Sequence, residues 1–295
     1  MIAVLLNRTS GTAKARPQIE RELHDLFAAA GRDMKIVELQ PGRPLPEIAQ
    51  EARESAGTDV VVAAGGDGTV SGTAAGLAGS PMPLGVLPLG TLNHFAKDLG
   101  IPAYLKQAVA VIAAGKIQPI DAGEVNGRVF INNASIGLYP DIVQERGALQ
   151  QRGYPKWPAM MLATLRVMRR YRGVTVRLDT GGLHETRRTP FVLVGNNEYA
   201  IEGIHLGARP RLDRGMLFAY LAPRLHAREL PLLVAEAALG RARNSGALEI
   251  VPAQDLSIDT SFARRIPVGL DGEVATMSPP LRFMSRPRAL NVIVP

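Results

Sequence analysis

The sequence predicts an α/β chain of two domains, an N-terminal domain with a mostly parallel sheet and a C-terminal domain of mostly antiparallel strands. Three observations support this prediction. The chain has 295 residues, more than one hydrophobic core usually spans. Its first third alternates short β-type runs with helical patterns, which is typical of βαβ units. Beyond residue 120 short, turn-bounded strands dominate, so the predicted domains are 1–120 and 121–295.

In the predicted N-terminal domain, strands and helices alternate. The predicted helix Ala13–Ala30 ends before Gly31, a residue that favours a helix C-terminus, and the strand Asp59–Ala64 is apolar enough to be buried on both faces. The other predicted strands are Ile2–Leu6, Lys35–Leu39 and Leu84–Leu87, and the other predicted helices are Ile48–Ala56, Val70–Leu77 and Tyr104–Ala114.

In the C-terminal part, strands become the commonest element. Asn126-Gly127 separates Ile120–Val125 from Arg128–Asn132 and predicts a tight hairpin, because both turn positions tolerate a positive φ. Two helices are predicted among the strands, Trp157–Tyr171 and Ala227–Leu239. The further predicted strands are Val174–Leu178, Thr189–Val194, Met216–Leu221, Leu248–Val251, Leu256–Asp259, Pro267–Leu270, Leu281–Met284 and Leu290–Val294.

Composition and charge limit the classes of function. Apolar stretches such as Leu230–Leu239 fall short of the roughly 20 residues that a bilayer span needs, so we expect no transmembrane helix. The sequence has 0 cysteines, which fits a reducing compartment, and the cytoplasm is the predicted location. The net charge of +7 favours anionic partners such as phosphates or anionic lipid, although a merely basic surface explains it equally well. Only this charge argues for nucleic acid, so no nucleic-acid partner is predicted.

Gly65-Gly66-Asp67-Gly68-Thr69 directly follows a predicted buried strand and directly precedes a helix. At this position an open α/β sheet exposes backbone amides to an anion. The glycines allow close approach of the backbone to phosphate oxygens, Thr69 offers a hydroxyl, and Asp67 suits a magnesium ion or a water network. A simple strand-to-helix turn is the alternative, but it does not need three glycines and an acid. The motif therefore predicts a phosphate site.

Two further polar loops follow predicted strands. Pro88-Leu89-Gly90-Thr91-Leu92-Asn93-His94-Phe95-Ala96 comes after Leu84–Leu87, and Asn7-Arg8-Thr9-Ser10-Gly11 comes after Ile2–Leu6. The carboxyl ends of parallel strands meet at one edge of the sheet, so these loops are expected beside the glycine motif. For Asn7–Gly11 taken alone, an ordinary surface loop is an equal alternative.

Together these three motifs resemble the diacylglycerol kinase catalytic domain family, which includes bacterial lipid kinases and sphingosine kinases. Later segments follow the family's order, namely Asn132–Gly137, Val194–Asn197 and Asp271-Gly272-Glu273. The resemblance covers nearly the whole chain. The set of motifs is specific, although Gly-Gly-Asp-Gly-Thr alone also occurs in NAD kinases.

The resemblance implies transfer of the γ-phosphate of ATP, with Mg²⁺, to a hydroxyl of diacylglycerol or a related lipid in phospholipid metabolism. It also implies a nucleotide-binding α/β domain, a β-sandwich-like acceptor domain and catalysis between them. Glu273 is the implied proton acceptor, assisted by Asp271, whereas spacing alone favours a hairpin turn with solvated acids there. The implied nucleotide-binding residues are Asn7, Ser10, Gly65, Gly66, Asp67, Gly68, Thr69, Thr91 and Asn93.

One segment departs from the family pattern. Many bacterial members carry a Leu-Asp-Asp-Gly-like segment whose second Asp, with neighbouring carbonyls, holds a structural or regulatory magnesium. This chain reads Leu212-Asp213-Arg214-Gly215-Met216, so Arg214 stands in place of that Asp. Asp213 and Met216 remain as the candidate metal ligands.

Lys156–Arg172 predicts a helix with an apolar face and a basic end. Such a helix could dock on an anionic membrane or shape a lipid pocket, and a core helix with a solvated end is the alternative. The apolar face comprises Trp157, Met160, Met161, Leu165 and Met168, and the basic end comprises Arg166, Arg169, Arg170 and Arg172.

Two other functions stay open. Asn197-Glu198 superficially matches the Asn-Glu pair of NAD kinases, which would make a soluble hydroxyl compound the acceptor. Arg214 also allows a non-catalytic regulator that binds nucleotide or lipid. Among lipids, diacylglycerol, a sphingoid base and phosphatidylglycerol are all candidates, and a homodimer through edge strands is a further open question.

Overall fold

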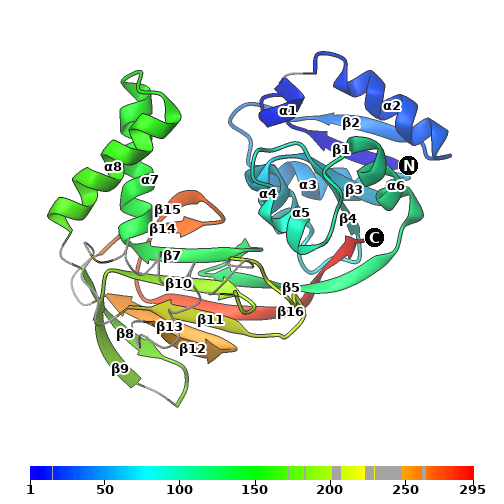
Figure 1. The fold of residues 1–295 in the computed structure, drawn as a ribbon. Helices are drawn as coiled ribbons and strands as arrows, with labels where there is room; N and C mark the ends of the chain where they lie inside the picture. Colours follow the sequence, from blue (N-terminus) through cyan, green and yellow to red (C-terminus); the bar gives the residue numbers. More distant parts are fainter. Residues whose placement is uncertain are drawn as a thin grey trace. The chain divides into compact units, whose positions relative to one another are not determined.

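The structure is a computed structural model that describes residues 1–14, 16–171, 173–182, 184–200, 207–222, 229, 248–260 and 264–295. It divides into two compact units, unit 1 with Met1–Ala122 and Pro287–Pro295, and unit 2 with Gly123–Arg286 (Figure 1). The predicted architecture, a parallel N-terminal sheet followed by antiparallel strands, is confirmed. Apart from Glu229, the predicted helix Ala227–Leu239 lies outside the described residues, as does Arg172.

Unit 1 contains a parallel sheet in the order β2-β1-β3-β4. Its four strands are β1 (Ile2–Leu6), β2 (Met34–Glu38), β3 (Val60–Gly65) and β4 (Pro83–Pro88). The central strands β1 and β3 are buried along their whole length, as their unbroken apolar sequences predict. Helix α3 packs against α4 and helix α2 against α6, and both pairs contact the sheet. The helices are α1 (Gly11–Lys14), α2 (Ile19–Ala29), α3 (Leu45–Glu54), α4 (Asp67–Leu77), α5 (His94–Asp98) and α6 (Leu105–Ala114).

The first predicted helix is interrupted. The sequence pattern predicts one helix over Ala13–Ala30, whereas the structure has α1 and α2 separated by Pro17. Proline disfavours the helical conformation in the preceding residue and lacks the amide hydrogen that a continuous helix needs. The prediction of a single helix was therefore wrong at its N-terminal end.

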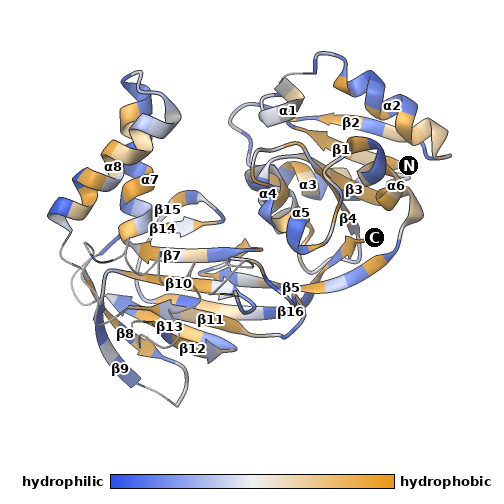
Figure 2. Ribbon diagram, in the orientation of Figure 1, coloured by the Kyte–Doolittle hydropathy of each residue, from blue (hydrophilic) through white to orange (hydrophobic). Residues whose placement is uncertain are grey.

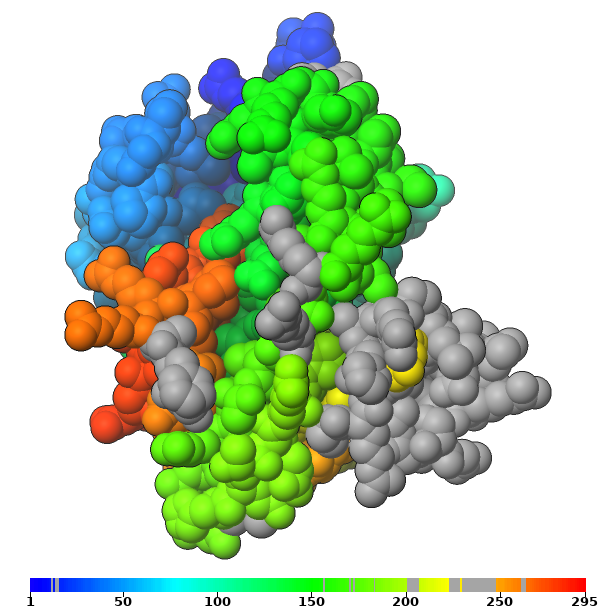
Figure 3. All heavy atoms as spheres, turned by 90° about the vertical axis from the view of Figure 1, so that its left-hand side faces the viewer, coloured from blue at the N-terminus to red at the C-terminus, as the bar shows by residue number. Residues whose placement is uncertain are grey.

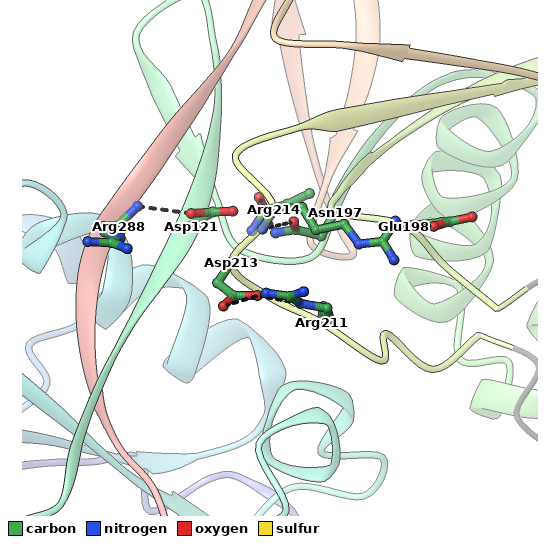
Figure 4. A network of polar contacts seen from close by, with 8 residues as sticks. Asp121, Asn197, Glu198, Arg211, Asp213, Arg214 and Arg288 are labelled. Atoms are coloured by element: carbon green, nitrogen blue, oxygen red, sulfur yellow. Dashed lines mark hydrogen bonds and ion pairs between the residues drawn. The ribbon is translucent and has the colours of Figure 1, made fainter.

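The last strand returns to unit 1. Strand β16 (Leu281–Ile293) is continuous where the sequence predicts two strands, and its end pairs in parallel with β4. Within it Arg288 adopts a positive φ, and its amide donates to the buried carboxylate of Asp121 at 2.9 Å (Figure 4). The sequence-based boundary assigns Pro287–Pro295 to the second domain, whereas the pairing with β4 places these residues in unit 1.

Unit 2 is built on antiparallel strands. One sheet has the order β12-β11-β10-β7-β14-β15, and the other strands continue from β16 through β13 and β8 to β9. Their inward-facing apolar side chains form one shared core that includes Phe130, Val192, Leu217 and Phe283, so two layers pack face to face. The strands are β5 (Ile117–Val125), of which the part up to Ala122 belongs to unit 1, β6 (Arg128–Phe130), β7 (Asn133–Gly137), β8 (Val174–Asp179), β9 (His184–Thr189), β10 (Phe191–Asn196), β11 (Leu217–Leu221), β12 (Glu249–Ala253), β13 (Asp255–Thr260), β14 (Ile266–Leu270) and β15 (Glu273–Met277).

A helical hairpin is attached to unit 2. Helix α7 (Leu138–Gln151) contacts β7, β14 and β15, and helix α8 (Lys156–Arg170) packs against α7. Helix α8 buries its small residues Ala159 and Ala163, while the larger Trp157 and Met161 are each 75% exposed. The predicted apolar face is therefore largely on the surface, where Figure 2 shows hydrophobic residues along α8 and Figure 3 shows the green hairpin facing the viewer. Among the described residues no helix combines the length and hydropathy needed to cross a membrane.

Candidate functional site

Three loops meet at the carboxyl edge of the parallel sheet in unit 1. We name them loop 1 (Asn7–Ser10), loop 2 (Gly65–Thr69) and loop 3 (Pro88–Asn93). They follow β1, β3 and β4, which are neighbours in the sheet, so the strand order alone brings the loops together. A backbone hydrogen bond of 2.9 Å from Leu89 to the carbonyl of Gly65 joins loop 3 to loop 2.

Glycines allow the backbones of these loops to touch. A Cβ atom built on Gly90 would lie 2.5 Å from the Cα atom of Gly66. A Cβ atom on Gly11, directly after loop 1, would lie 2.7 Å from the carbonyl oxygen of Leu89. Both separations are too short for real side-chain contacts, so only glycine fits at these two positions. The result is a surface of bare backbone of the kind that binds phosphate groups.

Loop 1 supports loop 2 through side chains. The amide of Asn7 donates from Nδ2 to Oγ1 of Thr69 at 3.0 Å, and the Asn7 backbone amide donates to the carbonyl of Ala64 at 2.9 Å. Ser10 uses its hydroxyl within its own loop, donating to the carbonyl of Asn7 at 2.9 Å. Asn7 therefore orients the Thr69 hydroxyl, and Ser10 stabilises the turn that holds Asn7.

Loop 2 spans the end of β3 and the first residues of helix α4, and the chemistry of its acid fits a bound cation. Helix α4 begins at Asp67 after Gly66, and no side chain caps its first turn. The helix dipole favours an anion at that end. Within the described part of the chain, the buried Oδ1 atom of Asp67 has no hydrogen-bond partner. A carboxylate oxygen in this state needs a donor or a cation, and a nucleotide phosphate with its Mg²⁺ would supply one at this position.

Loop 3 is held in shape by Asn93. Its Oδ1 atom accepts from the Gly90 amide at 2.9 Å, and its Nδ2 atom donates to the carbonyls of Gly90 at 2.9 Å and Pro88 at 3.3 Å. Asn93 has a φ of 51°, a left-handed conformation that asparagine tolerates better than most residues. Its side chain is thus engaged by its own loop, while Thr91 is exposed.

The contact between Gly90 and Gly66 provides a specific prediction. Gly90→Ala is expected to destabilise the protein by about 1–3 kcal/mol, because the new methyl group overlaps backbone that cannot move aside. The methyl group should also push loops 2 and 3 apart and so weaken the ATP binding that the resemblance implies. Thermal unfolding and calorimetric titration with ATP would measure both effects.

Gly147→Ala is the matched control. Gly147 lies in α7, and a Cβ atom there has no neighbour within 4 Å. Alanine in a helix interior is expected to stabilise by roughly 0.5–1 kcal/mol. Equal stability and ATP affinity of Gly90→Ala and the wild type would contradict the proposed glycine contact.

The second candidate group lies in unit 2, at the turn between β14 and β15. Asp271 and Gly272 both have positive φ, so the predicted hairpin turn is present. The Asp271 carboxylate is not a solvated acid: it accepts the backbone amides of Ile131 at 2.9 Å, Asn132 at 2.8 Å and Asn133 at 3.0 Å. Glu273 is exposed at the first position of β15. Asp271 is thus held by the backbone, whereas Glu273 faces solvent.

A buried arginine next to this turn has no counterpart among the sequence-based predictions. Arg209 is 3% exposed, and its Nη1 atom donates to the carbonyl of Ile131 at 2.6 Å. Its Nη2 atom donates to Oδ1 of Asn132 at 2.7 Å, and Asn196 donates from Nδ2 to the same Ile131 carbonyl at 2.9 Å. Arg209 and Asp271 therefore bind the same segment, Arg209 through oxygens and Asp271 through backbone amides. The sequence around Arg209, which precedes Pro210 in a predicted loop, contains no pattern that predicts a buried arginine.

The candidate metal ligand Asp213 is engaged by an arginine (Figure 4). Its carboxylate accepts from Nε of Arg211 at 2.9 Å and from Nη2 at 3.1 Å. The hydrogen bond with Asp213, and then the charge of that carboxylate, raises the pKa of Arg211 above its ordinary value. Arg214 pairs with Glu198 at 2.8 Å, and the Arg214 amide donates to Oδ1 of Asn197 at 2.9 Å. The donor set therefore does not fit the metal that the resemblance implies.

Two family models match the chain. The diacylglycerol kinase catalytic domain matches residues 1–125, and the YegS C-terminal NAD kinase beta sandwich-like domain matches residues 143–294. A protein named diacylglycerol kinase from Bacillus subtilis (strain 168) is 31% identical, over 99% of this chain and 95% of that protein. The chain therefore belongs to the diacylglycerol kinase family.

Other relatives cover part of the sequence or share the fold. A Klebsiella pneumoniae (strain 342) protein named "Probable lipid kinase YegS-like" is 37% identical over 46% of this chain and 46% of its own length. A solved structure from Bacillus anthracis str. Sterne, described as a diacylglycerol kinase, has a TM-score of 0.72 and 19% identity, covering 100% of this chain and 96% of that one. A second chain from the same strain has a TM-score of 0.78 and 23% identity, with 100% and 95% covered. At these identities the structures show the fold alone.

Proposed function

We propose that this chain is an ATP-dependent lipid kinase that transfers the γ-phosphate to a hydroxyl of diacylglycerol or a related lipid alcohol. The observation that supports it most is the meeting of loops 1, 2 and 3 at one sheet edge, with glycine backbones in contact. The names of the family relatives support the kinase class and the lipid acceptor. A kinase of a soluble hydroxyl compound and a non-catalytic regulator both explain the three loops together with these relatives less well.

In the proposed reaction, unit 1 binds ATP. The backbone of Gly65, Gly66 and Gly68 and the hydroxyls of Thr69 and Thr91 contact its phosphates. Asn7 orients the Thr69 hydroxyl, while Ser10 and Asn93 keep their loops in the binding shape. Asp67 is the residue that would hold Mg²⁺, and the ion supplies neutralisation of the phosphate oxygens when it is bound.

Unit 2 supplies the proton acceptor in this proposal. The lipid hydroxyl oxygen forms a bond to the γ-phosphorus, and the bond from that phosphorus to the bridging oxygen breaks, which releases ADP. The hydroxyl proton passes to the carboxylate of Glu273. Asp271 is assigned a positioning function, because its oxygens accept three backbone amides.

A comparison of acceptors tests this function. The purified chain is incubated with γ-labelled ATP and MgCl₂, and separately with diacylglycerol, a sphingoid base, phosphatidylglycerol and NAD. We expect label in a lipid, with diacylglycerol the first candidate. Label in NAD alone would favour the soluble acceptor. ATP binding without transfer to any acceptor would favour the regulator.

Contact with an anionic membrane is a further part of the proposal, with the chain acting from the cytoplasm. Helix α8 contains no acidic residue, and Arg166 and Arg169 on it are exposed. Trp157, Met161 and Leu165 follow one another at a spacing of one helical turn and are 75%, 75% and 48% exposed. An exposed apolar row beside arginines is complementary to the interface of an anionic bilayer.

Trp157→Gln/Met161→Gln is expected to lower binding to vesicles that contain phosphatidylglycerol, because the buried apolar area on the bilayer is lost. Sedimentation with vesicles, at low and high salt, measures the change. Tyr104→Gln is the matched control, since Tyr104 is 76% exposed but lies before α6 in unit 1. Equal loss of binding in both variants would argue against docking by α8.

A further inference from the structure

The segment Arg209–Met216 lies directly before β11 and contains three arginines. The most buried of these is Arg209, whose guanidinium donates to the carbonyls of Ile131 at 2.6 Å and Asn196 at 3.2 Å. It also donates to Oδ1 of Asn132 at 2.7 Å. The ring of Tyr199 lies 5.5 Å from the guanidinium carbon, a distance at which a cation and an aromatic face attract.

Three acceptors of Arg209 among the described residues are oxygens of neutral groups. Two are backbone carbonyls and one is a side-chain amide, which are ligand types that Mg²⁺ and Ca²⁺ take from proteins. Here a guanidinium that is fixed to the chain supplies the positive charge to these oxygens. A protein cation is thus bonded to oxygens that suit a hard metal ion.

In the part of the chain that the structure describes, two carboxylates of this region, Asp213 and Glu198, pair with arginines. Asp213 is bound by two nitrogens of Arg211, a geometry that uses both carboxylate oxygens. Glu198 is paired with Arg214 at 2.8 Å. A divalent cation at Asp213 would have to displace Arg211 and would lie beside a second positive charge on the neighbouring residue Arg214.

We propose that arginine side chains, rather than a divalent cation, keep the Arg209–Met216 segment in place in this chain. The resemblance to the diacylglycerol kinase family implies a metal at this segment, and the side chains found here do not fit one. The Mg²⁺ proposed to accompany ATP is assigned to a different residue, Asp67 in unit 1. The segment is therefore ordered without added metal, whether or not the chain transfers phosphate.

Thermal unfolding of the nucleotide-free full chain tests the proposal. Protein treated with a chelator is compared in MgCl₂, in CaCl₂ and in NaCl of matched ionic strength, for the wild type, Asp67→Asn and Asp213→Asn. We expect Asp67→Asn to unfold at one temperature in all three salts. A rise with MgCl₂ or CaCl₂ that persists in Asp67→Asn and is lost in Asp213→Asn would overturn the proposal. A rise in the wild type that Asp67→Asn abolishes assigns the ion to loop 2 and leaves the proposal standing.

Arg214→Asp adds a second readout. This variant places a carboxylate next to Asp213 and removes the partner of Glu198, so it should unfold at a lower temperature in NaCl. It should then gain a rise in Tm with MgCl₂, because paired carboxylates attract a divalent cation. Arg214→Ala, which removes the charge without adding an acid, should gain none. A rise in Tm with MgCl₂ that persists in Asp67→Asn and is as large as the rise in Arg214→Asp would contradict the proposal. The unfolding of the wild type and Asp67→Asn decides the matter if Arg214→Asp does not fold.

Discussion

Glu273→Gln is expected to lower kcat for phosphate transfer by about 10²–10⁴-fold, the usual contribution of a general base. Glutamine keeps the size of the side chain but cannot accept the proton of the attacking hydroxyl. Steady-state kinetics with saturating ATP and lipid measure the loss. The KM for ATP should stay unchanged, because Glu273 is proposed to take the proton of the lipid hydroxyl and is not one of the proposed nucleotide-binding residues.

Glu273 is expected to contribute little to the stability of the fold. It is exposed at the first position of β15, so Glu273→Gln should change the free energy of unfolding by no more than about 0.5 kcal/mol. Asp255→Asn is the matched control, because Asp255 is an exposed acid at the first position of β13. A kcat of Glu273→Gln equal to that of the wild type and of Asp255→Asn would remove Glu273 from the proposed mechanism.

Asp271→Ala is expected to cost roughly 3 kcal/mol or more in the free energy of unfolding. The carboxylate accepts three backbone amides, and each hydrogen bond to a charged group contributes about 1.5–3 kcal/mol. Asp271→Asn should lose less, because asparagine tolerates the φ of 48° and keeps one acceptor oxygen. Urea unfolding of both variants measures the two losses in the free energy of unfolding.

The effect of Asp271 on activity separates a positioning function from a catalytic one. If Asp271 acts through the turn that presents Glu273, Asp271→Asn should keep more activity than Glu273→Gln while losing more stability. Unfolding free energies of Asp271→Ala and Asp271→Asn equal to the wild type would contradict the three hydrogen bonds. Loss of activity in Asp271→Asn as deep as in Glu273→Gln, at unchanged stability, would assign Asp271 to the chemistry.

The phosphate loops are the part of the account that the sequence predicts best. Each loop follows a strand whose apolar run is continuous, so the strand and the loop are both visible in the sequence. Parallel strands bring their carboxyl ends to one edge of the sheet, so the position of the loops beside one another is predicted as well. The sequence does not show which polar side chains remain free to bind. The amide side chain of Asn93 is of a type that can bind a nucleotide, yet it is hydrogen-bonded to Gly90 and Pro88 in its own loop.

The parts that the sequence does not predict depend on partners far along the chain. Arg209 is bonded to Ile131, and the end of β16 pairs with β4, and neither contact has a local signature. Helix α7 is missed because its sequence alternates small, polar and charged residues without a clear apolar face. Helix α8 is predicted, but its packing is not, because α7 accepts the small residues Ala159 and Ala163 in place of the larger apolar ones.

The most direct test of the central proposal is the appearance of the γ-phosphate of ATP in diacylglycerol. The wild type, Asp67→Asn and Glu273→Gln are compared with MgCl₂ in mixed micelles, and labelled lipid and ADP are both counted. The account predicts equal amounts of labelled phosphatidic acid and ADP from the wild type and a large loss in both variants. ADP without labelled lipid, or equal transfer by all three proteins, would contradict it.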